Sequence, residues 1–159
     1  MTSLLPGLII RYMLVLIGAQ FAIFLLALVL DAYGWGDSLS SAANVAVLIA
    51  AGAAAGSHLA GKLKARPGWG TSLRLSGLLA LVAVVTGSLL LLGIVFLNGI
   101  TEAELALLAA QMGMTPPVAA LMLAGVSLVL TYPVTLAGFR LGAGATARQI
   151  ERRGPLTGI

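Results

Sequence analysis

Long apolar runs separated by short polar segments dominate the pattern of this chain. Four of these runs contain no Asp, Glu, Lys or Arg, and they cover residues 12–30, 38–59, 75–97 and 117–139. Each reaches about 20 residues, the length that a helix needs to cross the hydrocarbon core of a bilayer. Backbone groups in hydrocarbon must be hydrogen-bonded within their own segment, and these runs are too long for barrel strands. The pattern therefore predicts an all-α membrane protein with four transmembrane helices in a single domain over residues 1–159.

A shorter amphipathic segment lies between the third and fourth runs. Thr101 is followed three residues later by Glu104, which is the spacing of a capping box at a helix start. Gly113 is placed to end the helix. One face of the segment is apolar and consists of Leu105, Leu108 and Met112. We expect a short interfacial helix over about 102–112 that lies flat on the membrane surface or covers the end of the bundle.

Charged residues sort to opposite sides of the four predicted spans. All nine Lys and Arg fall on the side of both termini: Arg11, Lys62, Lys64, Arg66, Arg74, Arg140, Arg148, Arg152 and Arg153. The other side receives Asp31, Asp37, Glu102 and Glu104. Cytoplasmic loops carry the excess of Lys and Arg in membrane proteins. We therefore expect both termini in the cytoplasm (N-in, C-in), the 102–112 helix in the second outer loop, and residues 140–159 as a cytoplasmic basic tail.

The composition changes how this basic charge is interpreted. The chain is 60% hydrophobic and only 9% charged, yet its net charge is +4. Because the basic residues flank apolar segments, anionic lipid headgroups of the inner leaflet are better partners for them than nucleic acid. We expect the headgroups, or an acidic partner protein, to contact His58, Lys62, Lys64, Arg66, Arg74, Arg140, Arg148, Arg152 and Arg153.

Small residues are concentrated in the second run and near the end of the fourth. Gly52, Gly56 and Ala60 follow one another at intervals of four residues, and Gly138 and Gly142 repeat that interval. Small residues allow the close backbone contact on which helix association in lipid depends. These five positions are therefore predicted to form helix-packing interfaces, either within the chain or with a second copy or another membrane protein.

His58 is the only histidine, and the chain has no cysteine. A zinc site within one chain would need more His or Cys ligands than these. Ser57 is adjacent to His58, so the two side chains point about 100° apart on a helix, and no third group is available to orient the base. We expect no metal site, no cofactor and no catalytic residues, and we interpret His58 as a residue at the membrane interface.

Several polar residues interrupt the apolar runs. Gln20, Asn44, Thr131 and Thr135 are predicted to be buried between helices. Interhelical hydrogen bonds of this kind each contribute about 0.6–2 kcal/mol. A polar path for a solute is the alternative interpretation. The two interpretations differ in whether the four side chains converge on one cavity or are satisfied separately.

Three short motifs resemble those of a known family. They are Arg-Tyr at residues 11–12, Arg-Pro at 66–67 after the Ala- and Gly-rich second run, and Arg-Leu at 74–75. In this pattern the chain resembles an uncharacterised family of small four-span proteobacterial inner-membrane proteins known only by a locus-tag name. Members often carry a glutamate between the proline and the later arginine, where this chain has GWGTS. The resemblance implies a location in the bacterial inner membrane and no particular activity.

Two classes of function fit these features. The first is a non-catalytic interaction protein: an accessory subunit, or an assembly or stability factor, of a larger membrane complex or of a homo-oligomer. The second is a small transporter, channel or lipid-handling protein, although coupled transport normally uses an ionisable residue inside the membrane and the apolar runs contain no Asp, Glu, Lys or Arg. A membrane enzyme is disfavoured because the short loops offer no acid–base pair.

Overall fold

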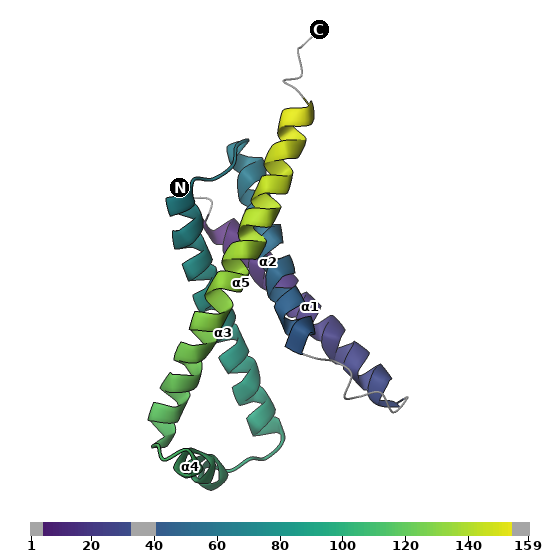
Figure 1. Cartoon of the computed structure of the whole chain (residues 1–159). Helices are drawn as coiled ribbons and strands as arrows, with labels where there is room; N and C mark the ends of the chain where they lie inside the picture. The colour runs from purple at the N-terminus through teal and green to yellow at the C-terminus, as the bar shows by residue number, and fades with distance from the viewer. Residues whose placement is uncertain (1–4, 33–40, 154–159) are drawn as a thin grey trace.

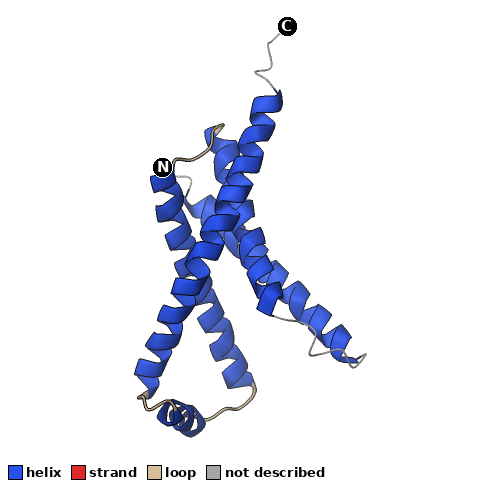
Figure 2. Cartoon of the chain, viewed as in Figure 1, coloured by secondary structure: helices blue, strands red, loops and turns tan. Residues whose placement is uncertain are grey.

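The computed structural model describes residues 5–32 and 41–153, and these residues form helices joined by short loops (Figures 1 and 2). The helices are α1 Leu5–Ala32, α2 Ser41–Leu63, α3 Trp69–Leu97, α4 Glu102–Gln111 and α5 Pro116–Arg153. Four of them, α1, α2, α3 and α5, are long and apolar enough to cross a membrane. The expectation of an all-α chain with four candidate spans is confirmed.

The long helices extend beyond the apolar runs. α3 begins at Trp69 instead of residue 75, and α5 continues to Arg153, so residues 140–153 prolong the fourth helix instead of forming a separate tail. A helix of 38 residues is about 57 Å long at 1.5 Å per residue, well beyond the roughly 30 Å of a hydrocarbon core. Hydropathy detects only the part of a helix that crosses hydrocarbon. The Ala, Arg, Gln and Glu residues after Phe139 are good helix formers that carry the helix further.

The helices are arranged as two pairs that cross and then diverge. α1 packs on α2, α3 packs on α5, and the closest association between the pairs is the contact of α2 with α5. Figure 1 shows the crossing near the end of the molecule that carries the α2–α3 loop and the last turns of α5. We call this the basic end; toward the opposite end the pairs separate, and α4 lies there between the ends of α3 and α5.

Glycines bring the backbones of α2 and α5 into direct contact. A Cβ atom added to Gly52 would lie 2.8 Å from the Thr135 carbonyl oxygen, and one added to Gly56 would lie 2.8 Å from the carbonyl carbon of Phe139. From the other side, a Cβ on Gly138 would lie 2.9 Å from the Ile49 Cα. Gly142 is equally close to the backbone of Ala53. No side chain fits between the two helices at these positions.

Small residues also allow other helices to approach α2. Ala51, Ala55 and Ala60 are fully buried. The buried apolar cluster at the crossing contains residues from all four long helices: Leu8, Tyr12, Leu16, Val47, Ala51, Ala55, Leu59, Leu79, Ala83 and Phe139. On α3 the buried residues end at Ala83, because beyond it the two pairs have separated.

The local signals around α4 are confirmed. The Thr101 backbone N–H donates to the Glu104 carboxylate at 2.8 Å, and the Glu104 N–H donates to the Thr101 hydroxyl at 3.4 Å, which completes the capping box. The helix ends at Met112, and Gly113 adopts a φ of +69°, a conformation that glycine tolerates at no steric cost.

The contact between α2 and α5 predicts a large difference between glycines of the same helix. Gly56→Leu places a side chain against the backbone of Phe139, whereas Gly61→Leu meets nothing within 4 Å. We expect Gly56→Leu to destabilise the fold by about 1–3 kcal/mol or more, as overpacking does. The melting temperature of the purified protein in mild detergent measures this loss of stability. Equal melting temperatures for the two variants would contradict the observed packing.

Candidate functional site

A partly open cavity of about 1050 Å³ lies mainly between α3, α4 and α5, and α1 and α2 complete its wall where the helix pairs diverge. Much of the wall is aliphatic. It includes Leu16 and Ile17 of α1, Leu48 of α2, Leu90, Leu91 and Leu92 of α3, and Leu123 of α5. The volume is at the upper end of the range of about 300–1,000 Å³ that is typical of small-molecule sites. Such a cavity accepts a large apolar molecule.

Three of the four predicted polar residues face this cavity. Gln20 and Thr131 are half-buried beside it, and Asn44 also lines it. The sequence predicts that Asn44 is buried between helices. In the structure its side chain is exposed, because it lines the open cavity and is not covered by another helix. Four further polar residues line the same cavity: Thr86, Ser88, Gln111 and Ser127.

Thr135 lies elsewhere. It is fully buried at the crossing, near the fully buried Tyr12 of α1, although the two hydroxyl groups do not reach standard hydrogen-bond geometry. Ser76 of α3 is a third fully buried hydroxyl. The four polar residues therefore do not share one site: Thr135 belongs to the core, and the other three border the cavity.

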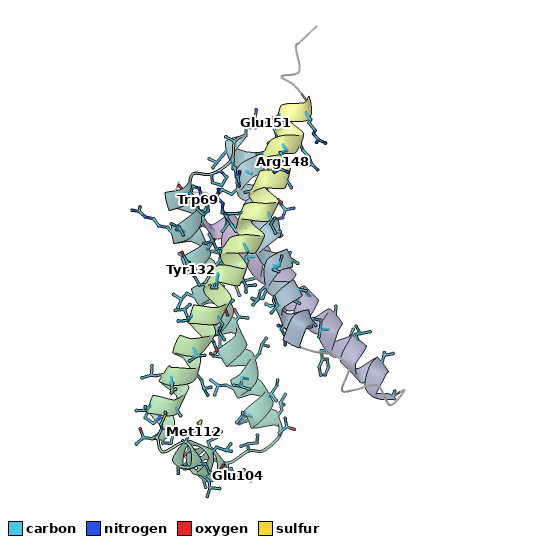
Figure 3. All side chains as sticks on the ribbon, in the orientation of Figure 1. Trp69, Glu104, Met112, Tyr132, Arg148 and Glu151 are labelled. Carbon is cyan, nitrogen blue, oxygen red and sulfur yellow. The ribbon has the colours of Figure 1, made fainter. Side chains whose placement is uncertain are left out.

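The short helix α4 closes the cavity at the end opposite the basic end. Its apolar face supplies Leu105, Leu108 and Met112 to the cavity wall, and Ala109 is buried beside them. Figure 3 shows Met112 on the side of α4 toward the helix pairs and Glu104 at its other side. The apolar face of this helix therefore lines the cavity, and its polar face points away from the cavity.

A second, shallower pocket of about 550 Å³ lies between α1 and α2 at the basic end. It is lined by Arg11, Ala54, Ser57, His58, Gly61 and Lys62. Arg11 donates a hydrogen bond from Nη1 to Nδ1 of His58 at 2.8 Å. A guanidinium has only donors, so Nδ1 is the acceptor and the imidazole is neutral with its hydrogen on Nε2. His58 thus orients Arg11.

Two of the residues that were predicted to contact headgroups also lie against the protein. The guanidinium of Arg140 stacks on Trp69, with Cζ 3.3 Å from the ring centroid, in a cation–π contact. The guanidinium of Arg66 lies beside Gly144 of α5. Both contacts join the α2–α3 loop or the start of α3 to α5 at the basic end.

The other predicted headgroup residues are exposed at or near the basic end: Lys62, Lys64, Arg74, Arg148 and Arg152. Arg153 ends α5, and its side chain lies outside the described part of the chain.

Sequence reasoning missed three members of these sites: Arg11 and Ser57 in the basic pocket, and Trp69 under Arg140. The interval of four between His58 and Lys62 places both on one face of α2, which is a signal available in the sequence. Nothing in the sequence pairs that face with Arg11, because the partner is on another helix.

Comparisons of the sequence with protein-family models and with curated proteins, and of the fold with solved structures, gave no match.

The Arg140–Trp69 contact predicts a change in loop protection. Arg140→Gln removes the cation, and cation–π contacts are worth about 0.5–2 kcal/mol. We expect tryptic cleavage after Lys64, in the α2–α3 loop, to become about 2- to 30-fold faster. Arg148→Gln, from an exposed position on the same helix, is the control. Equal cleavage rates in all three proteins would show that the contact does not hold the loop.

Proposed function

We propose that this chain is a non-catalytic, multi-pass protein of the bacterial inner membrane that binds a membrane lipid in the cavity lined mainly by α3, α4 and α5. The observation that carries this proposal is the cavity of about 1050 Å³ whose wall combines aliphatic side chains with a few polar ones from all five helices. Ligand sites usually have this composition: an apolar lining with a small number of polar groups that fix orientation.

The wall chemistry supports a lipid as the occupant. Acyl chains match the leucine-rich surfaces of α3 and α5. The amides of Gln20 and Asn44 and the hydroxyl of Thr131 offer donors and acceptors at membrane depth. Polar groups in hydrocarbon are costly unless they are hydrogen-bonded. The ester or hydroxyl groups of a lipid supply such partners, whereas a purely apolar helix face does not.

The charge distribution supports the orientation of the protein in the membrane. All nine Lys and Arg precede, follow or connect the spans on the side of the basic end, which the positive-inside rule assigns to the cytoplasm. In this orientation the cavity faces the outer half of the bilayer, and α4 lies at the outer interface with Glu102 and Glu104 near water.

An accessory subunit is the second candidate, and exposed aliphatic side chains outside the cavity favour it. Leu121, Val129 and Leu130 of α5 are more than 60% exposed, as is Leu89 of α3. A helix of another membrane protein could cover such surfaces. Gly52 and Gly56 of α2 and Gly138 and Gly142 of α5 do not serve that contact, since they face each other.

Filling the cavity tests the lipid proposal. Gly87 lines the cavity and has no atom within 4 Å of an added Cβ, so Gly87→Phe occupies the cavity without disturbing the backbone. Gly93 is equally unobstructed on the same helix but does not line the cavity, so Gly93→Phe is the matched control. Native mass spectrometry of the full chain from mild detergent should show at least threefold fewer lipid adducts for Gly87→Phe and no change for Gly93→Phe.

The outcome separates the two candidates. Equal lipid retention by both variants would refute lipid binding in this cavity. Stoichiometric co-purification of another membrane protein, lost specifically in Gly87→Phe, would assign the cavity to a partner helix instead.

The orientation is tested by chemical labelling, because the chain contains no cysteine. A single cysteine introduced as Glu102→Cys should react with a membrane-impermeant maleimide in cells whose outer membrane has been permeabilised. Lys64→Cys should react only after the inner membrane is opened. The reverse result would invert the proposed topology.

A further inference from the structure

The pocket at the basic end is lined mainly by polar and basic side chains, whereas the cavity lined by α3, α4 and α5 is mostly aliphatic. The two share no residue. Every polar side chain that lines it can donate hydrogen bonds: the guanidinium of Arg11, the hydroxyl of Ser57, the imidazole of His58 and the ammonium of Lys62. A pocket lined by donors of this kind suits an anion.

The helices hold these donors at fixed positions. His58 and Lys62 are one turn apart on the same face of α2, and Arg11 reaches His58 from α1. Among the described residues, His58 accepts one hydrogen bond from Arg11, and the other four N–H groups of the guanidinium have no protein partner there. Ala54 and Gly61 supply the small surfaces between the polar side chains, and Gly61 has no neighbour within 4 Å of a Cβ position.

The electrostatics of the pocket favour the same ligand. Two cations, Arg11 and Lys62, line one pocket, and none of its lining residues is acidic. Two like charges held close together repel each other, and an anion bound between them offsets this repulsion. Glu102 and Glu104 lie on α4 at the opposite end of the molecule, and Glu151 lies on the last turns of α5 at the basic end but does not line the pocket.

We infer that Arg11, Ser57 and Lys62 form a binding site for a phosphate group, with His58 as the residue that positions Arg11. An arginine fork matches two oxygens of a phosphate, a lysine adds a second charge, and a serine hydroxyl adds a further donor. The site goes beyond the proposed lipid cavity and does not depend on it. The phosphate group could belong to a phospholipid of the adjacent leaflet or to a soluble phosphate.

The single histidine provides a direct readout of this site. The full chain, carrying a tag without histidine and labelled with [¹⁵N]histidine, gives the imidazole signals of His58 alone in maltoside micelles. Three probes are titrated separately: dihexanoyl-phosphatidylglycerol, inorganic phosphate, and dihexanoylglycerol as the phosphate-free control. We expect a saturable shift of the His58 signals with a phosphate-bearing probe and none with dihexanoylglycerol.

Variants assign the shift to the pocket. Arg11→Gln and Lys62→Gln should each weaken the affinity at least tenfold, whereas Lys64→Gln, outside the pocket, should leave it unchanged. Arg11→Lys, which keeps the charge but loses the fork, should give an intermediate affinity. Unchanged melting temperatures show that the variants remain folded.

The result also identifies the source of the phosphate. Saturation by the phospholipid alone assigns the site to a lipid headgroup, and saturation by inorganic phosphate as well assigns it to a soluble anion. A shift with dihexanoylglycerol, no shift with either phosphate probe, or wild-type affinity in both Arg11→Gln and Lys62→Gln would overturn the inference. Because the basic pocket and the cavity share no residue, the Gly87→Phe variant should bind the phosphate probe normally even where its lipid binding in the cavity is lost.

Discussion

The backbone contact between α2 and α5 is the constraint on which the rest of the structure depends. In a bilayer no hydrophobic force drives helices together, so their association depends on close van der Waals packing. Gly52 and Gly56 on one helix and Gly138 and Gly142 on the other leave no side chain between the two backbones at these four positions. α1 then packs on α2 and α3 packs on α5, so the fold is two helix pairs joined at this crossing.

The same constraint explains why the molecule is open at the other end. Small residues are concentrated at the crossing, whereas the distant halves of α3 and α5 carry large side chains such as Leu91 and Leu123. α3 and α5 do not approach each other closely there, and the space between them becomes the main part of the cavity. α4 covers the end of this space through its apolar face. A fold held at one end thus produces an apolar cavity within the depth of the membrane.

The basic end combines intramolecular contacts with free positive charge. Arg140 stacks on Trp69 and Arg11 binds His58, so some of the basic residues stabilise the protein itself. Others, such as Lys64 and Arg148, are exposed. Each exposed basic residue near an anionic leaflet contributes about 1 kcal/mol to membrane attachment. In the proposed orientation, some of the basic residues that would orient the protein in the membrane therefore also build the basic pocket.

From the sequence alone one can predict the four long helices, the start of α4 at Thr101 and its end near Gly113. Hydropathy runs and capping motifs depend only on residues that are close in the chain. The sequence identified Gly52 and Gly138 as packing residues and Gln20 and Thr131 as polar residues in membrane spans, but not their partners. The folded structure is needed to see that the glycines of α2 and α5 face each other. It is also needed to see that Thr135 lies in the core while Gln20, Asn44 and Thr131 border the cavity, and that Arg11 contacts His58. These pairings join different helices, and the crossing angle and relative depth that create them leave no periodic signal in the sequence.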